Sequence, residues 1–381
     1  MGTYHQMGHY SENLLNDSEL GQFCGAILSP VNYNEQAIAS QVSTTREHEN
    51  WETIFDPQLY YPKSERGLLR DWDYFPSGAD TSDIQSDTWW KNVTEKIVAS
   101  ISRIRPNASC SPAFAPRSFT NDYYSMIIDI GNHFCGSLAN SGIQPIQTVL
   151  AGMADLSTPK RALEVSSIVS RTSTTSVYLV LVSDIPPRRE FSDVEGLKGS
   201  MRLISALVDS GLNVIIGFCS SDMILWKAAG ASSCATGKYF NLRRFTSSRF
   251  EEPAEGGGQL PYWFEESLIA FLRESDIIRV KKAGKISQAN IANPFSRQIF
   301  DCIENDQGNP WLGLSWRHYM YSFADLKYRI HKNDVDIPLL LKTAENTWLH
   351  LEDNGVLMEE IRNNGEWIRA WRRALIEYKS F

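Results

Sequence analysis

The sequence lacks the cysteine spacings that hold small metal and redox sites. Its six cysteines lie singly along the chain and no Cys-x-x-Cys pair occurs, so neither a zinc ribbon nor a thioredoxin-type site is expected. We interpret the cysteines as small buried side chains. Unpaired cysteines are typical of a reducing compartment, and we therefore expect the protein in the cytoplasm.

Three other signatures are missing as well. The chain has no Gly-x-Gly-x-x-Gly, which would open a dinucleotide-binding sheet, and no Gly-x-Ser-x-Gly, which would mark a serine hydrolase. Its seven histidines form neither His-x-His nor His-Glu-x-x-His. No cofactor is evident, and of the metal sites only a carboxylate-bound Mg²⁺ stays compatible with the sequence.

Long apolar runs are also missing. No stretch approaches the roughly 20 apolar residues of a membrane helix, and residues 1–17 are too polar for a secretory signal, so no membrane association is expected. The 45 acidic and 37 basic side chains give a net charge of −8. This balance argues against broad non-specific binding to nucleic acid and leaves room for local basic patches.

What the sequence does contain is a regular alternation of strand-length apolar runs with helical patterns. The eight expected strands cover residues 22–30, 51–55, 108–114, 144–150, 176–182, 213–218, 232–236 and 260–264. A helix over residues 266–273 would close the ring. The expected fold is therefore an α/β protein with a TIM-type (β/α)8 barrel, and the main rival is a doubly wound open sheet.

The two ends of the chain differ from this pattern. Residues 1–20 are interpreted as a mobile arm or a short helix, the barrel is expected over residues 21–285, and residues 286–381 show helical patterns without strand alternation. Amphipathic helices are expected over residues 344–357 and 359–378. The basic side chains near the C-terminus form either a solvated helix face or a patch for a partner. They are Arg362, Arg369, Arg372, Arg373 and Lys379.

Residues 212–245 predict a binding site. This stretch has the pattern of a strand, a short helix and a second strand, followed by Gly237 and a segment with Lys238, Arg243 and Arg244. In (β/α)8 enzymes the loops after the last strands often bind phosphate, and arginine can bind phosphate in a bidentate manner. The alternative is that the glycine only makes a turn and the arginines are solvated.

Acid–base chemistry would need carboxylates at the ends of strands, where barrels place their active sites. Asp56 follows the strand expected at residues 51–55, and Asp184 follows the strand expected at residues 176–182. Two carboxylates in unlike environments can divide proton donation and acceptance, so we expect this pair to be catalytic. Taken singly, each is more often a capping or loop residue.

Further polar side chains and one glycine follow the expected strands and are candidates for substrate binding. They are Tyr60, Arg66, Arg117, Arg188, Ser221, Gly237, Lys238, Arg243 and Arg244. Tyr60 could stack on a base or sugar ring, and Arg66 could pair with an acidic group. Alternatively, the loop that carries these two residues only folds over the barrel mouth.

Together these features favour a cytoplasmic barrel enzyme, of the hydrolase, lyase or transferase type, that acts on a phosphate-bearing, nucleotide-like ligand by carboxylate acid–base chemistry. The alternative is a non-catalytic barrel that serves as a binding or assembly module and docks a protein or nucleic-acid partner through residues 286–381. An enzyme requires Asp56 and Asp184 to converge on one ligand. A docking module requires an exposed apolar or basic face on the C-terminal helices.

Overall fold

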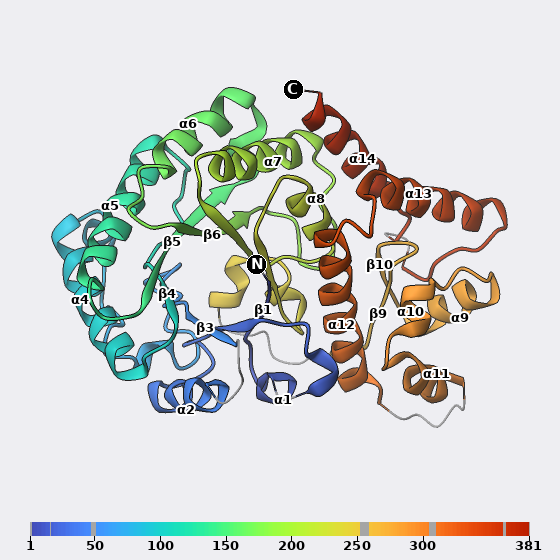
Figure 1. Cartoon of the computed structure of the whole chain (residues 1–381), viewed down its shortest axis with the longest axis horizontal. Helices are drawn as coiled ribbons and strands as arrows, with labels where there is room; N and C mark the ends of the chain where they lie inside the picture. The colour runs from blue at the N-terminus through green and yellow to red at the C-terminus, as the bar shows by residue number, and fades with distance from the viewer. Residues whose placement is uncertain are drawn as a thin grey trace.

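The computed structural model describes residues 2–15, 17–46, 51–251, 259–304, 310–360 and 363–380. Its centre is a closed barrel of eight parallel strands in chain order, with β8 paired to β1 (Figure 1). The strands are β1 (Thr3–Gln6), β2 (Gly25–Leu28), β3 (Glu52–Phe55), β4 (Ala108–Cys110), β5 (Gln144–Gly152), β6 (Ser176–Val182), β7 (Asn213–Gly217) and β8 (Ser233–Thr236). This is the expected (β/α)8 barrel, and it rules out the doubly wound open sheet.

The first strand lies at the N-terminus, where the sequence predicts an arm. Tyr4 pairs with Gly25 of β2 and with Ala235 of β8, so the start of the chain is part of the barrel. All four residues of β1 are buried although they are mostly polar. The Tyr178 hydroxyl donates a hydrogen bond of 2.8 Å to Gln6 Oε1. The prediction of an arm at the N-terminus is wrong. The side chains of β1 are mostly polar and have polar partners inside the barrel. The segment therefore lacks the apolar run by which a strand is recognised in a sequence.

Seven of the expected strands coincide with β2 to β8, but the last one does not join the barrel. Instead, β9 (Trp263–Glu265) pairs antiparallel with β10 (Ala270–Leu272), which also replaces the helix expected at residues 266–273. Hydrogen bonds from the backbone N–H of Ser267 to Glu265 Oε1 and of Leu268 to the Glu265 carbonyl close the turn between them. This turn reverses the chain before a helix can form.

The outer ring of helices surrounds the barrel and is completed from the C-terminal region. The helices between the strands include α1 (Glu12–Leu15), α2 (Glu35–Thr45), α4 (Asp87–Ile104), α5 (Asn121–Ser137), α6 (Pro159–Val169), α7 (Val194–Asp209) and α8 (Met223–Ala228). After β8, helix α12 (Leu312–His331) packs against α8 and against η1 (Ser18–Leu20). The Tyr319 and Thr236 hydroxyls lie 2.7 Å apart. Helix α12 therefore takes the eighth position of the ring.

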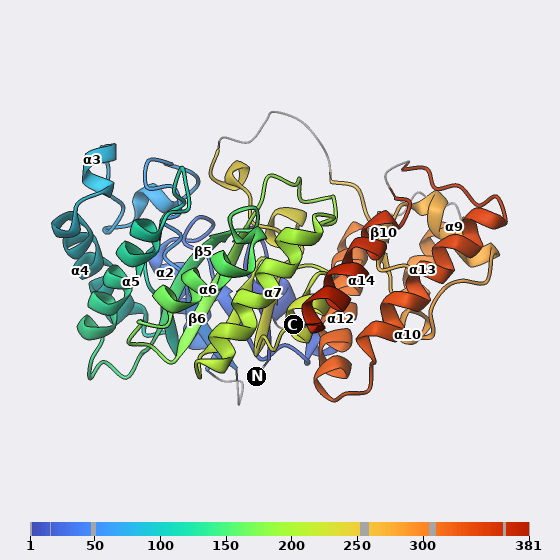
Figure 2. The ribbon, with the colours of Figure 1, turned by 90° about the horizontal axis from the view of Figure 1, so that it is seen from above.

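The other C-terminal helices form a layer at one side of the barrel (Figure 2). They are α9 (Glu274–Lys282), α10 (Gln288–Ala292), α11 (Ser296–Glu304), α13 (Ile337–Asp353) and α14 (Glu366–Lys379). Helix α14 packs on α7, where Trp371 Nε1 donates to the Phe191 carbonyl at 2.8 Å and Lys198 pairs with Glu377 at 2.6 Å. The tryptophans at 348, 367 and 371 are buried, so they belong to the core of this layer.

The basic side chains near the C-terminus are largely paired within the layer. Arg369 and Arg372 form ion pairs with Glu345, and Arg373 pairs with Glu377 at 2.7 Å. Arg362 lies outside the described residues. The described part of the chain contains no helix that could span a membrane.

Gly237 follows β8 at a point where the chain has no room for a side chain. A methyl group there would lie 2.6 Å from the Gln6 carbonyl oxygen and 2.5 Å from Leu242 Cβ. Because overpacking a rigid site costs about 1–3 kcal/mol, Gly237→Ala should lower the free energy of unfolding by that amount in urea denaturation. Gly136→Ala is the control, since nothing lies within 4 Å of that position. An equal loss in both variants would contradict the prediction.

Candidate anion-binding cavity

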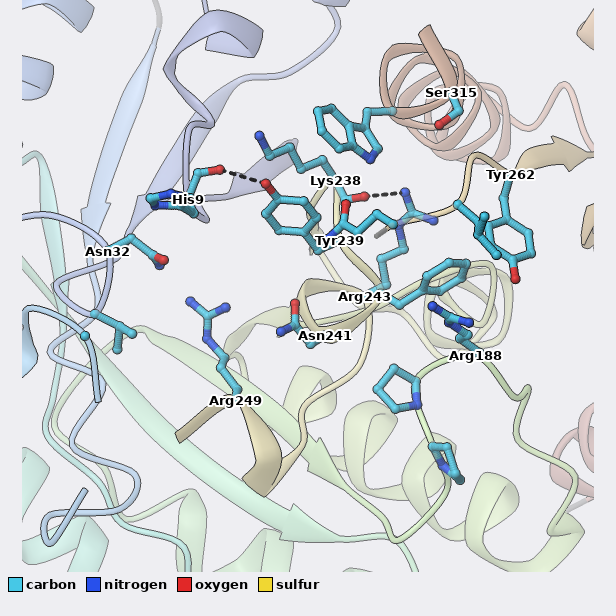
Figure 3. A pocket seen from close by; sticks show the side chains of 18 of the residues that line it. His9, Asn32, Arg188, Lys238, Tyr239, Asn241, Arg243, Arg249, Tyr262 and Ser315 are labelled. Atoms are coloured by element: carbon cyan, nitrogen blue, oxygen red, sulfur yellow. Dashed lines mark hydrogen bonds between the residues drawn. The ribbon is translucent and has the colours of Figure 1, made fainter. Parts of the chain in front are cut away.

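A large cavity opens at the C-terminal ends of the strands. Its volume is about 1090 Å³. Its walls come from the loops after β1, β2, β3, β6 and β8, from the segment that leads into β9, and from α12 (Figure 3). (β/α)8 barrels carry their sites on this face. Here the cavity extends from the barrel mouth to α12.

The charged side chains that line the cavity are all basic. They are Arg66, Arg188, Arg189, Lys238, Arg243 and Arg249, and no Asp or Glu is found among the lining residues that the structure describes. This local excess contrasts with the net charge of −8 of the whole chain. A concave surface lined by one sign of charge attracts ligands of the opposite sign.

Arg243 is buried in the cavity wall, with 3% of its surface exposed. Its Nε donates to the Gly237 carbonyl at 3.0 Å, and its Nη2 donates to the Lys238 carbonyl at 2.8 Å. The guanidinium carbon lies 3.5 Å from the centre of the Tyr319 ring and 4.8 Å from that of Phe240. These partners are neutral, and burial lowers the pKa of Arg243 to about 10.

Lys238 is held in a similar way. Its Nζ donates to the Tyr10 carbonyl at 2.7 Å and lies 4.5 Å from the centre of the Trp316 ring. The Tyr239 ring centre lies 4.8 Å away on another side. Burial lowers the pKa of Lys238 to about 8. The ammonium group is therefore mostly charged at pH 7 and loses its proton just above that pH.

Arg249 enters the cavity from the side opposite Lys238 (Figure 3). It lies in η5 (Ser247–Phe250) and is 7% exposed. Its Nη2 donates to Ser29 Oγ at 3.1 Å, whereas its buried Nε finds no hydrogen-bond partner among the described residues. Burial lowers the Arg249 pKa to about 10, although the nearby Asp56 opposes this shift. Arg249 follows no strand directly, so its place in the sequence does not mark it as a candidate. Its only signal was its closeness to the arginine pair at 243 and 244.

Arg244 lies outside the cavity and supports the loop after β6. Its Nη1 donates to the Arg189 carbonyl, and its Nη2 lies 3.5 Å from Glu190 Oε2. Its guanidinium carbon lies 3.7 Å from the centre of the Phe191 ring. Burial raises the pKa of Glu190 to about 7. Arg244 thus positions the backbone that carries Arg188 and Arg189 rather than contacting a ligand itself.

Aromatic side chains fill the barrel mouth. Phe245 and Phe250 pack edge-on against Tyr60, with ring centres 5.2 and 5.8 Å away. Phe218 packs against Phe245 at 5.4 Å. The Tyr60 hydroxyl donates to Asp56 Oδ2 at 2.8 Å. Because Tyr60 is 1% exposed, its ring is not open for stacking on a base or sugar.

The structure does not bring Asp56 and Asp184 together at the cavity. Asp56 is 1% exposed and accepts hydrogen bonds from Tyr60 and from the Gln58 backbone. Burial raises its pKa to about 6. Asp184 is exposed, and neither carboxylate lines the cavity. The geometry therefore gives no support to the expected acid–base pair.

The remaining expected binding residues divide into two groups. Those that line the cavity are Arg66, Arg188, Lys238 and Arg243. The others do not. Arg117 is exposed, Ser221 is buried and donates to Glu190 Oε1 at 3.3 Å, and Gly237 packs against β1 and Leu242. Position 237 thus requires a glycine because other parts of the protein, and not a ligand, lie close to its backbone.

Metal ligands do not gather in the part of the chain that the structure describes. No group of three or more His, Cys, Asp or Glu side chains is arranged there to hold an ion. The carboxylate-bound Mg²⁺ that the sequence left open therefore has no candidate ligand set among these residues.

Comparison with known proteins identifies no family for this chain. No protein-family model matches the chain, and no curated protein matches its sequence. A family 18 chitinase from Crocus vernus aligns with a TM-score of 0.40 and 12% identity over 66% of this chain and 96% of its own. L-ribulose 3-epimerase aligns with a TM-score of 0.36 and 9% identity over 87% and 98%. Similarity this low carries nothing about ligand or reaction.

The buried Asp56 should make stability depend on pH. Its carboxyl keeps a proton up to about pH 6 in the folded chain but only up to about pH 3.8 when unfolded. The stabilisation from this proton is complete below pH 3.8 and is lost as the pH rises to about 6. As the pH rises over this range, the unfolding free energy of the wild-type protein should fall by up to about 3 kcal/mol relative to that of Asp56→Asn.

Urea denaturation of both proteins at intervals between pH 4 and 7 measures this difference. Asp184→Asn removes an exposed carboxylate after the strand β6 and serves as the control for the loss of one charge. The prediction is wrong if the difference in unfolding free energy between the wild-type protein and Asp56→Asn stays constant with pH.

Proposed function

We propose that the cavity binds a phosphate-bearing ligand of nucleotide size. The observation that carries this proposal is the way in which the cavity holds its cations. Arg243 and Lys238 donate to backbone carbonyls, and Arg188 lies near aromatic rings. The carboxylates that act on Arg243 and Lys238, Glu190 and Glu12, do not line the cavity. An anionic ligand would supply an opposite charge inside it.

The energetics of buried charge support this proposal. Moving a cation away from water is costly unless an opposite charge or hydrogen bonds compensate. The lowered pKa values of Arg243 and Lys238 are a measure of that cost. A bound phosphate would favour the charged forms of both groups, and charge-assisted hydrogen bonds are the stronger ones. Arginine suits this role because its planar guanidinium matches two phosphate oxygens.

The size and lining of the cavity favour a ligand larger than inorganic phosphate. A volume of about 1090 Å³ is at the upper end for sites that bind small organic molecules. Tyr262, Trp316 and Leu260 add aromatic and aliphatic surface to the lining. A sugar phosphate or nucleotide combines an anionic group with an uncharged part that would contact this surface.

Lys238 is our candidate for acid–base chemistry in this cavity. A pKa of about 8 is close enough to neutral pH for a side chain to give and take a proton. Lys238 is therefore the residue we propose to test for a hydrolase, lyase or transferase activity. Asp56 and Asp184 lie outside the cavity lining and are not part of this proposal.

The alternative function, docking of a protein or nucleic acid through residues 286–381, has less support. Its basic side chains at 369, 372 and 373 are paired with carboxylates of the same helical layer. The cavity, in contrast, has no acidic side chain among its lining residues. Net positive potential is therefore expected at the cavity rather than on the C-terminal helices.

Binding of phosphate compounds should stabilise the folded chain. We expect pyrophosphate or adenosine 5′-monophosphate to raise the melting temperature, because a ligand that binds only the native state adds free energy of about 2.7 kcal/mol at a concentration of 100 Kd. The double variant Lys238→Met, Arg188→Gln should lose most of this shift. Thermal unfolding with increasing ligand is the measurement.

Arg117→Gln is the matched control, because Arg117 is an exposed arginine after the strand β4 that does not line the cavity. This variant should keep the full shift. The proposed function is wrong if no phosphate compound shifts the melting temperature, or if Arg117→Gln loses as much of the shift as the double variant.

Anion binding should weaken above neutral pH because Lys238 loses its charge. With a pKa of about 8, the ammonium group is present below that pH and lost above it. We therefore expect the affinity for adenosine 5′-monophosphate to fall between pH 7 and 9 in titration calorimetry. Lys238→Arg should bind without this decline because arginine stays charged. The same decline in native chain and variant would contradict a role for Lys238.

A further inference from the structure

Four of the six basic side chains that line the described part of the cavity form two groups. Arg66 and Arg249 lie on one side, and Arg188 and Arg189 lie on the other. Figure 3 shows Arg249 and Arg188 on opposite sides of Asn241, which projects between them. Arg243 belongs to the wall between the two groups and has its donors engaged with backbone carbonyls.

This separation follows from the order of the strands. Arg66 lies in the loop after β3, and Arg249 is bonded to Ser29, which follows β2. Arg188 and Arg189 lie in the loop after β6. In a closed ring of eight strands, β2 and β6 are four places apart, so their ends face each other across the barrel axis. The two groups therefore reach the cavity from opposite sides of the barrel mouth.

The surroundings of Arg249 favour the binding of an anion. The Arg249 guanidinium is more than nine-tenths buried, and its hydrogen bond to Ser29 fixes its direction. Its Nε has no partner in the described part of the structure. A buried donor without a partner is costly, and a phosphate oxygen at this end would satisfy it.

The side after β6 is more open but has a well-supported backbone. Arg188 is exposed and lies 5.7 and 5.8 Å from the ring centres of Phe240 and Tyr262. Pro186 and Pro187 restrict the loop in front of it. Arg244 donates to the Arg189 carbonyl from below the cavity. Two arginines are thus presented from one fixed loop, without a lining carboxylate to neutralise them.

The geometry points to a ligand with two phosphate groups, one at each end, joined by a spacer of the size of a sugar or nucleoside. This inference rests on the proposed function and names the class of ligand for the same cavity. The spacer would lie along Asn241, which lines the cavity between Arg249 and Arg188 (Figure 3). A monophosphate would contact one of the two groups, and a second phosphate would add a contact with the other.

Titration calorimetry on the full chain with two matched pairs of compounds tests this inference. The pairs are adenosine 5′-monophosphate with adenosine 3′,5′-bisphosphate, and fructose 6-phosphate with fructose 1,6-bisphosphate. In at least one pair the second phosphate should raise the affinity about tenfold or more, as expected for an added charge-assisted contact.

Variants at each end then locate the two phosphates. Arg188→Gln and Arg249→Gln should each remove the gain from the second phosphate, and only one of them should also weaken the monophosphate. Arg66→Gln replaces Arg249→Gln if the latter does not fold. Arg117→Gln, outside the cavity, should keep the full gain.

The possible outcomes separate this inference from the proposed function. If the monophosphates bind but neither bisphosphate binds more tightly, the two-phosphate ligand is wrong and the anion site stands. The same conclusion follows if the gain survives both Arg188→Gln and the variant at the other end. If none of the four compounds binds, both the inference and the proposed function are overturned.

Discussion

The contacts of the Arg243 guanidinium connect the parts of the molecule that form the cavity. It bonds to the carbonyls of Gly237 and Lys238 at the end of β8 and lies over the Tyr319 ring of α12. It also lies 4.9 Å from the centre of the Phe271 ring of β10. One buried cation thus ties the last barrel strand to the helix that completes the ring and to the hairpin beside it. Its hydrogen-bond and ring partners are neutral, and the carboxylate that acts on it, Glu190, does not line the cavity.

The filled barrel mouth explains why the cavity extends towards α12. Phe245 and Phe250 come from the segment after β8, and they pack on Tyr60 above Asp56. Aromatic packing of this kind stabilises the segment and excludes water from the carboxyl of Asp56. Ligand binding on this face is therefore left to the space between the loops and α12, where the charged lining side chains are all basic.

Part of the cavity lining could be predicted from the sequence, for one physical reason. Arg66, Arg188, Lys238 and Arg243 line the cavity because parallel strands end on one face and the loops that follow them meet there. Asp56, Tyr60 and Ser221 also follow strands, but their side chains point into the packed interior. A residue that follows a strand lies at the C-terminal face of the barrel. This position does not decide whether its side chain points to solvent or into the core. Arg249 comes late in its loop and gave no such signal.

The sequence by itself determined the class of fold, because apolar runs with the spacing of β/α units can bury their strands in few other ways. It also determined the face on which the basic loops gather. Only the tertiary structure decided that the polar segment at residues 3–6 is the first strand, since its burial depends on partners such as Tyr178 from a distant strand. Only the tertiary structure decided that α12, which comes late in the chain, completes the ring of helices. It also decided the charge of the cavity. The pairing of each cation with a carboxylate depends on contacts between distant segments, and the sequence does not show which segments come together.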